Sequence, residues 1–438
     1  MNTGRVISYS FILLLVAYTL TFAVELTIGE CIDMALSTDE TLSSYYSDLE
    51  STHGQVISAR GGFFPQLNVS SSYTRLKDIP MVTMPGDLIG QPGTEIRIPM
   101  GTSENFDFKT QLIQPLYAGG RIWSGYKMSK AGESAMDYNV REYKNTLVFN
   151  VRKQYLSLLL TDSLINVTKE SIGLAEEHYK VAEERYNVGY TSKFEKLRAE
   201  VSVTNLKSSS TNLENTRKVQ EEALRQALNL DPAEPIILKD EMEYMPFDMT
   251  IDDCKDKALN QRPAILAVNE TEELMRRKIS LARANYFPMI SVIGGYDLAS
   301  TDFNDRSDWQ DNWSVTLSLS WTPFDGFITH GESITAHADY KSIKFKKSAM
   351  KEGVEVEVEG LYQKLESAKD NLSAQESNIG LASEGVKIAE AQYEVGLSTN
   401  LDVLDAQLAL HQAKLGYYQA LYDYLTSLYD MKRAMGEM

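Results

Sequence analysis

Four segments of the chain alternate apolar and polar side chains with a period of two. In the first, Leu67, Val69 and Tyr73 share one side, and Ser71 is the one polar residue among them. The other segments have the apolar sets Phe106, Phe108 and Leu112; Ile290, Val292, Tyr296 and Leu298; and Trp313, Val315, Leu317, Leu319 and Trp321. Such alternation over about ten residues, with aromatic residues near both ends, is typical of transmembrane β-strands; a half-buried strand of a soluble sandwich is the alternative. We predict strands at about residues 66–76, 104–116, 289–299 and 312–322.

Two long stretches contain no proline, and alanine, leucine, glutamate, lysine and glutamine dominate both. All 12 prolines lie outside Leu116–Asp231 and Phe324–Met438, which predicts two long helical regions. Each region is interrupted once, at Val188–Ser192 and at Val395–Thr399, where glycine precedes hydroxyl residues. That order predicts a helix end followed by a new N-cap, so each region is a helical hairpin. A helix of this length is roughly 100 Å long at about 1.5 Å per residue, which indicates coiled-coil-like rods.

The chain repeats itself. Cys31–Leu36 recurs as Cys254–Leu259 at an offset of 223, and Tyr186–Gly189 recurs as Tyr393–Gly396 at an offset of 207. The offset decreases from 223 to 207 in the segment between the first two predicted strands. There the first copy has the longer loop, Leu76–Glu104, which contains four prolines. A large repeated unit with one main length change indicates a tandem duplication.

These patterns predict the following domain layout. A signal peptide is expected at 1–23. The first repeat, at 24–231, contains short helices to about 63, the first two strands and a helical hairpin at 118–230 with its tip at 188–192. After a linker at 232–250, the second repeat, at 251–438, contains helices to about 286, the other two strands and a hairpin at 325–436 with its tip at 395–399. We expect Pro65, Pro115, Pro288 and Pro323 at the junctions between strands and helices, where a fixed φ bends the chain.

The N-terminus and the charge limit the possible functions. Arg5 precedes a short apolar run, and Ala23 offers a cleavage site, so we predict a secretory signal; a buried N-terminal helix is the alternative. The net charge of −18 and the lack of a basic cluster in the sequence argue against nucleic-acid binding. We expect Cys31 and Cys254 to be buried in small apolar sites, with a disulfide the less favoured alternative. Glu30 beside Cys31 argues against a lipid-attachment signal.

Four strands cannot close a barrel. An open sheet in lipid leaves backbone groups unpaired at several kcal/mol each, and the smallest bacterial membrane barrels use about eight strands. The strands must therefore be shared among several copies of the chain. The predicted fold class is a mixed α+β membrane protein with two internal repeats, in which a shared transmembrane β-barrel continues into a long α-helical coiled-coil barrel.

This order of parts resembles the TolC family of outer-membrane channel components. The residues that carry the resemblance are Phe64-Pro65 and Phe287-Pro288 before the strands, Gln114–Gly120 and Trp321–Phe327 after them, and the Tyr-x-Val-Gly turns at both tips. The resemblance implies a homotrimer with a 12-stranded barrel in the outer membrane and an α-barrel in the periplasm that is closed at its far end. It also implies contact with outer-membrane lipid, a periplasmic adaptor protein and an inner-membrane pump of the RND, ABC or MFS type.

No constellation in the sequence indicates an enzyme. We find no nucleotide-binding loop and no nucleophile motif, and we expect no cofactor. Of the five histidines only His330 and His337 are close, seven apart, and the further ligands of a metal site are missing.

Two acidic residues after the second tip are candidates for a pore constriction. Asp402 and Asp405 are three positions apart and so share one face of a helix. By resemblance they match the family's periplasmic acidic ring, where six carboxylates from three chains would favour cations. Glu195 and Arg198 hold the equivalent places in the first copy and could bridge neighbouring hairpins, and Tyr393 matches a gating tyrosine that could bond to Glu195. The alternative is that these are solvated surface charges.

The two tips resemble the family's docking surface for adaptor hairpins. The candidate residues are Gly189, Tyr190, Thr191, Ser192, Gly396, Leu397, Ser398 and Thr399. Tyr190 and Leu397 are apolar groups at an exposed turn, which favours a partner; the alternative is that the glycines only end the helices. The family prototype has an arginine where this chain has Ser398, so the residue of its ionic latch between protomers is missing here.

The leading functional hypothesis is a passive exit duct of a tripartite efflux or type I secretion system. The alternative is a periplasmic coiled-coil adaptor or structural protein without a pore, which would not need four lipid-compatible strands. The cargo cannot be read from the sequence.

Overall fold

The computed structural model describes residues 24–85, 90, 93–230, 236–305 and 307–438, so the expected signal peptide lies outside the described residues. The chain divides into two compact units. The first, the helical unit, contains Lys144–Cys254, Glu357–Met438 and the N-terminal residues to Leu42. The second, the sheet unit, contains Ser43–Tyr143 and Lys255–Val356. The boundary falls inside two long helices, and each unit is described by itself below.

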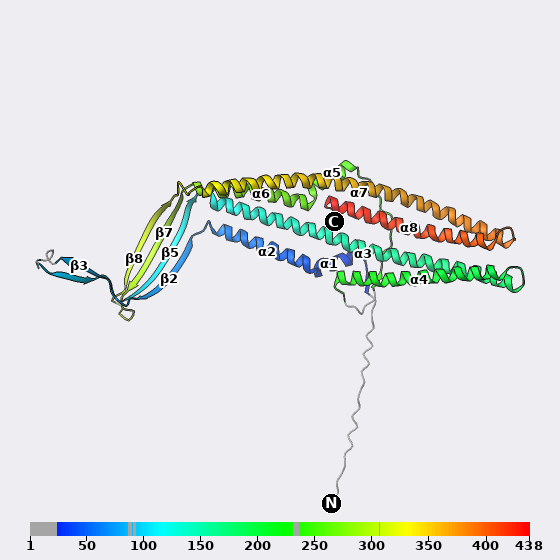
Figure 1. Ribbon diagram of the computed structural model, residues 1–438, viewed down its shortest axis with the longest axis horizontal. Coiled ribbons are helices and arrows are strands. Elements are labelled where there is room, and N and C mark those ends of the chain that lie inside the picture. Colours follow the sequence, from blue (N-terminus) through cyan, green and yellow to red (C-terminus); the bar gives the residue numbers. More distant parts are fainter. Residues whose placement is uncertain (1–23, 86–89, 91–92, 231–235, 306) are drawn as a thin grey trace, which may run out of the picture. The chain divides into compact units, whose positions relative to one another are not determined.

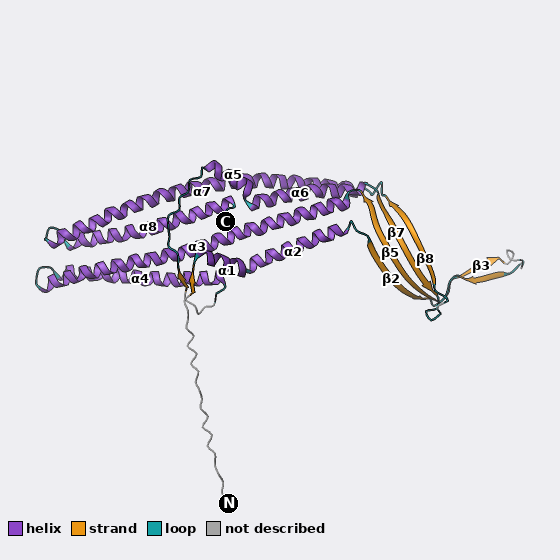
Figure 2. Ribbon diagram, turned by 180° about the vertical axis from the view of Figure 1, so that it is seen from behind, coloured by secondary structure: helices purple, strands orange, loops and turns teal. Residues whose placement is uncertain are grey.

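A four-stranded antiparallel sheet forms one part of the sheet unit (Figure 1). Its strands, in their spatial order, are β2 (Gln66–Arg75), β5 (Glu104–Ala118), β7 (Met289–Ser300) and β8 (Gln310–Ser320). Figure 2 shows the same order from behind. β5 pairs with β7, so the strands of the two sequence halves join in the middle of the sheet, and β2 and β8 each leave one edge free within the chain.

The register places the predicted apolar residues of all four strands on one face. One row across the sheet reads Leu67, Leu112, Gly294 and Val315. The next row on that face reads Val69, Thr110, Tyr296 and Trp313. Most of these large apolar side chains are exposed, so no described residue of this chain covers them. An apolar, uncovered sheet face is what contact with lipid requires.

One expectation about this region is wrong, and another was incomplete. Pro115 was expected at a strand–helix junction, but it lies inside β5 beside a shift in the β5–β7 register. Proline lacks the N–H that a ladder needs, so it is accommodated at such an irregularity. The expected loop Leu76–Glu104 contains a two-stranded antiparallel ribbon, β3 (Met81–Pro85) and β4 (Glu95–Pro99).

Two helices lead into strands of the sheet. The helix α2 (Glu40–Gly61) precedes β2, and α6 (Pro263–Arg283), followed by the short η2 (Ala284–Tyr286), precedes β7. The turn after β5 packs closely on η2. Gly119 has a φ of +59°, and a Cβ there would lie 2.6 Å from the carbonyl oxygen of Ala284 and 2.7 Å from Cβ of Phe287. Only glycine fits this turn, because both its backbone conformation and its surroundings exclude a side chain.

The long helices are built twice with the same lengths. They are α3 (Arg121–Asn187) and α7 (Ile328–Glu394), with 67 residues each, and α4 (Lys193–Leu228) and α8 (Asn400–Met435), with 36 residues each. Their first residues are related by the same offset as the two tips. The short helices α1 (Ile28–Thr38) and α5 (Ile251–Gln261) have 11 residues each, and they keep the larger offset of the two cysteines.

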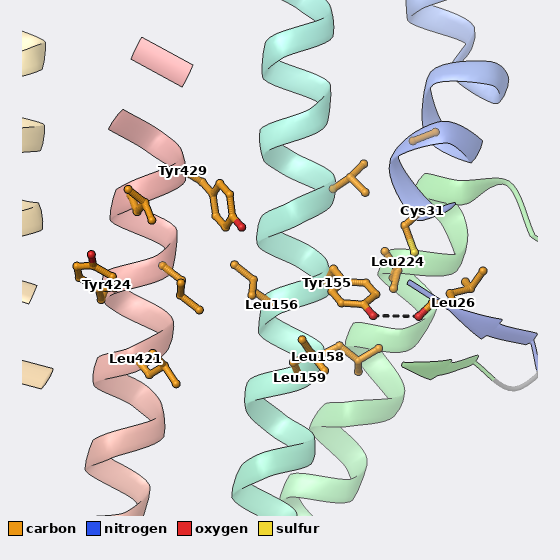
Figure 3. Packing of buried hydrophobic residues seen from close by; sticks show 14 of the residues in the cluster. Leu26, Cys31, Tyr155, Leu156, Leu158, Leu159, Leu224, Leu421, Tyr424 and Tyr429 are labelled. Carbon is orange, nitrogen blue, oxygen red and sulfur yellow. Dashed lines mark hydrogen bonds between the residues drawn. The ribbon is translucent and has the colours of Figure 1, made fainter. Parts of the chain in front are cut away.

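The hydrophobic core of the helical unit lies where α3, α4 and α8 meet two short parallel strands, β1 (Val24–Leu26) and β6 (Ile236–Leu238). Tyr155 is completely buried there, and its hydroxyl donates to the carbonyl oxygen of Leu26 at 2.9 Å (Figure 3). Leu158 and Tyr424 are also fully buried. Cys31 and Cys254 are both buried and free, which confirms their expected burial.

Candidate functional site at the helix tips

Both helical hairpins turn by the same backbone device. After α3, Gly189 has a φ of +84°, and the N–H of Tyr190 donates to the carbonyl oxygen of Arg185 at 2.8 Å. After α7, Gly396 has a φ of +80°, and the N–H of Leu397 makes the equivalent 2.8 Å bond. Glycine adopts this conformation without the steric cost of a Cβ, so both helices end in hydrogen-bonded left-handed turns.

The next helix of each hairpin begins with a hydroxyl N-cap. Ser192 caps α4 and Thr399 caps α8. Asp402 completes a capping box, because its carboxylate accepts from the N–H of Thr399 at 2.7 Å and from the Thr399 hydroxyl at 2.6 Å. These hydrogen bonds lower the pKa of the Asp402 carboxyl, so it stays ionised well below neutral pH. Glu195 accepts a hydrogen bond from the Thr191 hydroxyl at the first tip.

The tip turns expose large apolar side chains. Tyr190 is 86% exposed and Leu397 is 81% exposed, at equivalent places in the two hairpins. Sequence reasoning missed four further exposed apolar residues beside them, Val188, Phe194, Val395 and Leu401. Their signal was present in the sequence, because Val188 and Val395 occupy equivalent places in the two copies, as do Phe194 and Leu401. Exposed apolar groups at a turn are typical of a contact surface.

Within the single chain Tyr393 has neighbours other than Glu195, and its role in a gate stays a prediction. Its side chain is only 7% exposed, and the guanidinium of Arg185 lies 4.2 Å from its ring centre. His178 also packs against Tyr393, with ring centres 5.3 Å apart. In the part of the chain that the structure describes, no hydrogen bond joins Tyr393 to Glu195. The tyrosine is held by a cation and a histidine from α3 instead.

Arg198 and Asp405 come together, but they do not pair. Both line an open cavity of about 460 Å³ formed by α3, α4 and α8, together with His411 and Lys414. Both side chains are exposed, and within the described residues no ion pair joins them. The guanidinium of Arg198 lies 5.4 Å from the ring centre of Phe194 on its own helix. The bridge between neighbouring hairpins stays a prediction.

A polar cluster that sequence reasoning missed links the two hairpins close to their tips. Asn400, the first residue of α8, is 2% exposed; it bonds to His178 on α3, and its amide donates to the carbonyl oxygen of Glu195 at 3.2 Å. Arg185 donates to the carbonyl oxygens of Tyr393 at 3.2 Å and of Glu394 at 3.4 Å. A cation at the C-terminal end of α7 is favourable, because the last carbonyls of a helix lack partners. These contacts join α3 and α4 to α7 and α8.

Acid should weaken this cluster. Burial lowers the pKa of His178. Asn400 and Glu390 oppose this with smaller effects, and Arg185 lowers the pKa further. Burial also lowers the pKa of His411, which bonds to the Ser171 hydroxyl. Below the ordinary value of 6.5 the histidines of the unfolded chain take up protons that the packed ones do not, so stability falls as the pH falls through this range.

The measurement is thermal unfolding at pH 7.5, 6.5 and 5.0. We expect the variant His178→Gln/His411→Gln to lose less stability than the wild type between pH 7.5 and 5.0. If the two proteins lose the same stability between pH 7.5 and 5.0, His178 and His411 do not titrate in this transition.

A sheet with one uncovered apolar face, joined to paired helices of 67 and 36 residues with exposed apolar turns, is the architecture of an outer-membrane channel component. Residues 31–230 and 255–437 match the family described as outer membrane efflux protein. The chain belongs to this family. None of the helices in the described ranges is long and apolar enough to serve as a membrane span.

Solved structures with the same fold include an outer membrane protein and two outer membrane channels. VceC of Vibrio cholerae is 14% identical, with a TM-score of 0.77 over 93% of this chain and 96% of that one. CmeC of Campylobacter jejuni is 17% identical, with a TM-score of 0.76 over 94% and 85%. MtrE of Neisseria gonorrhoeae, in its open state, is 18% identical, with a TM-score of 0.73 over 93% and 88%.

Family membership confirms the predicted class of protein. The chain is an outer-membrane efflux protein, a transport duct and not an enzyme. The channel hypothesis therefore stands, and the alternative of a periplasmic adaptor without a pore does not.

Proposed function

We propose that three copies of this chain form a single closed pore, with a 12-stranded barrel above a helical tube. The observation that carries the proposal is the sheet order β2-β5-β7-β8, with one apolar face across all four strands and two edges free within the chain. Free edges in lipid are too costly to persist, so β8 of one copy pairs with β2 of the next. The two sequence halves, 24–231 and 251–438, then act as repeats that supply two strands and one hairpin each.

A second observation supports packing between copies. Ile334, Phe345 and Val356 on α7 are 57%, 65% and 72% exposed within the sheet unit. Each follows the one before it by three turns of helix, at about 3.6 residues per turn, so all three lie on one side of α7. Such a line of exposed apolar side chains on a long helix is covered when a helix of the next copy packs beside it.

The barrel proposal is tested by disulfide crosslinking across the proposed seam. We expect Ser314→Cys on β8, combined in turn with Asn68→Cys or Ser70→Cys on β2, to give crosslinked dimers and trimers on non-reducing gels. The native cysteines are buried, so the parent protein provides a low background. As the matched control, Ser314→Cys is combined with a cysteine at Lys218 on α4. If every pair stays monomeric while the purified protein conducts ions, β2 and β8 do not form the seam.

The tips form the gate and the docking surface in this proposal. Asp402 and Asp405 project exposed carboxylates beside the second tip, and three copies would bring six of them around the axis. The cluster of His178, Asn400 and Arg185 holds the two hairpins of one copy together in the closed pore. Adaptor binding to the exposed tips, with residues Gly189, Tyr190, Thr191, Ser192, Gly396, Leu397, Ser398 and Thr399, opens the pore when these contacts are released.

The partners follow from this arrangement. The duct has no energy source of its own, so a periplasmic adaptor and an inner-membrane pump of the RND, ABC or MFS type drive transport through it. Service to a type I secretion system uses the same tips and the same pore.

A further inference from the structure

A cluster of aromatic and basic side chains lies where the first helices meet the sheet. Phe63, which follows α2, packs edge-on against Trp123 and Tyr126 at the start of α3, with ring centres 6.2 and 6.0 Å apart. Trp123 is 53% exposed. Gln114 on β5 donates to the carbonyl oxygen of Phe63 at 3.2 Å, which ties this aromatic group to the end of the sheet.

One cation contacts these rings, and two more lie near them along α2 and α3. Lys127 lies over the Trp123 ring, with its Nζ 5.0 Å from the centre. Lys130 lies seven positions after Trp123 and so shares its face of α3. Arg60 is in the last turn of α2, and its carbonyl oxygen accepts a hydrogen bond from the N–H of Phe63 at 3.1 Å. Across the part of the chain that the structure describes, none of these three cations has an ion-pair partner.

The charge around this cluster differs from the rest of the chain. The chain carries a net charge of −18, yet neither Ser51–Pro65 nor Arg121–Gly132 contains an aspartate or glutamate. The second copy does not repeat the arrangement. There His330, Ile334 and His337 stand where the first copy has Trp123, Lys127 and Lys130, and Arg283 bonds to His337 at 3.0 Å. The second copy therefore lacks an equivalent of this cluster.

We propose that Arg60, Lys127 and Lys130, with Phe63, Trp123 and Tyr126, bind the headgroups of anionic phospholipids in the leaflet that faces the periplasm. The proposal rests on the transmembrane role of the strands in the proposed function. The helices leave the sheet on the periplasmic side, so the cluster lies at the level of that interface. Aromatic side chains favour the boundary between lipid and water, and basic residues beside it attract anionic headgroups.

The geometry of α3 supports this occupant. Lys127 and Lys130 lie about 9 and 14 Å along the helix from Arg121, at about 1.5 Å per residue. Side chains on a helix tilt toward its N-terminus, which for α3 is the end next to the sheet. Both ammonium groups are therefore directed back toward the membrane surface, where long basic side chains can reach the headgroups.

The test is a native mass spectrometry titration of the purified protein with phosphatidylglycerol and, separately, with phosphatidylcholine of the same acyl chains. We expect the wild type to prefer phosphatidylglycerol, and Arg60→Gln/Lys127→Gln/Lys130→Gln to lose on the order of 100-fold in that affinity, since each cation near an anionic surface contributes about fivefold. The control is Lys180→Gln/Lys218→Gln/Lys364→Gln, which removes the same charge from sites in the helical unit and should bind as the wild type does.

Several results would overturn the proposal. Equal affinities for the two lipids would do so, as would an unchanged phosphatidylglycerol affinity in the triple variant. Displacement of the lipid by inorganic phosphate would do so as well. If the triple variant loses oligomers but not bound lipid, a second copy covers the cluster instead. The same preparations are tested for conductance in planar bilayers. A wild type that forms no pore contradicts the proposed function, whereas conducting pores without a phosphatidylglycerol preference contradict this inference alone.

Discussion

Gly119→Ala should destabilise the protein by about 3 kcal/mol or more and reduce the amount of assembled channel. The residue has a φ of +59°, where a side chain costs about 1–2 kcal/mol. Its new Cβ would also meet the backbone of Ala284 at 2.6 Å and Cβ of Phe287 at 2.7 Å, and such overpacking costs about 1–3 kcal/mol more. Neither neighbour is the free end of a flexible side chain, so the turn between β5 and α3 has to move. Thermal unfolding of the purified protein measures the effect.

The adjacent glycine is a matched control. Gly120 has a φ of +82°, but a Cβ there would meet nothing within 4 Å. Gly120→Ala should therefore carry only the conformational cost of about 1–2 kcal/mol. If the two variants unfold at the same temperature, the close packing of Gly119 on η2 contributes nothing to stability.

Replacing the two acidic residues beside the second tip should remove most of the block of the pore by multivalent cations. For Asp402→Asn/Asp405→Asn we expect a trivalent cation such as hexamminecobalt to block with an affinity weaker by on the order of 100-fold, because six carboxylates around a narrow axis become neutral. Asparagine can still accept the hydrogen bonds from Thr399, so the N-cap of α8 is retained while the charge is lost. Single-channel recording in planar bilayers measures both conductance and block.

The control for this experiment is Asp370→Asn on α7, which removes an exposed carboxylate away from the tip. It should leave the block unchanged. The difference between the tip variant and the wild type should also shrink in 1 M salt, where the Debye length is about 3 Å. An unchanged block at low salt in the tip variant would exclude an acidic constriction at these residues.

The strands could be predicted because their pattern is local. Alternation at Leu67, Val69 and Tyr73 depends only on the period of an extended chain, and the register then aligned the apolar positions of all four strands. The helical turns were predictable for the same reason, since glycine followed by a hydroxyl residue satisfies the backbone within a few residues.

The contacts at the tips could not be predicted in this way. His178 and Asn400 are 222 residues apart, and Arg185 reaches Tyr393 across 208 residues. Nothing within a few residues of His178 distinguishes it from a solvated histidine. The equivalent positions were found from the repeat, but equivalence does not give contact, so the partners of Tyr393 and Arg198 within one chain did not follow from it.

The equal lengths of the paired helices limit where this chain can change in length. Each residue added inside α3 would rotate all later side chains by about 100°, which would turn Tyr155 and Leu158 away from the core. The two copies accordingly keep 67 and 36 residues in their long helices, and their main difference in length falls in the segment with the ribbon of β3 and β4. That ribbon is where an epitope or a fluorescent label can be added to the chain without changing the register of either hairpin.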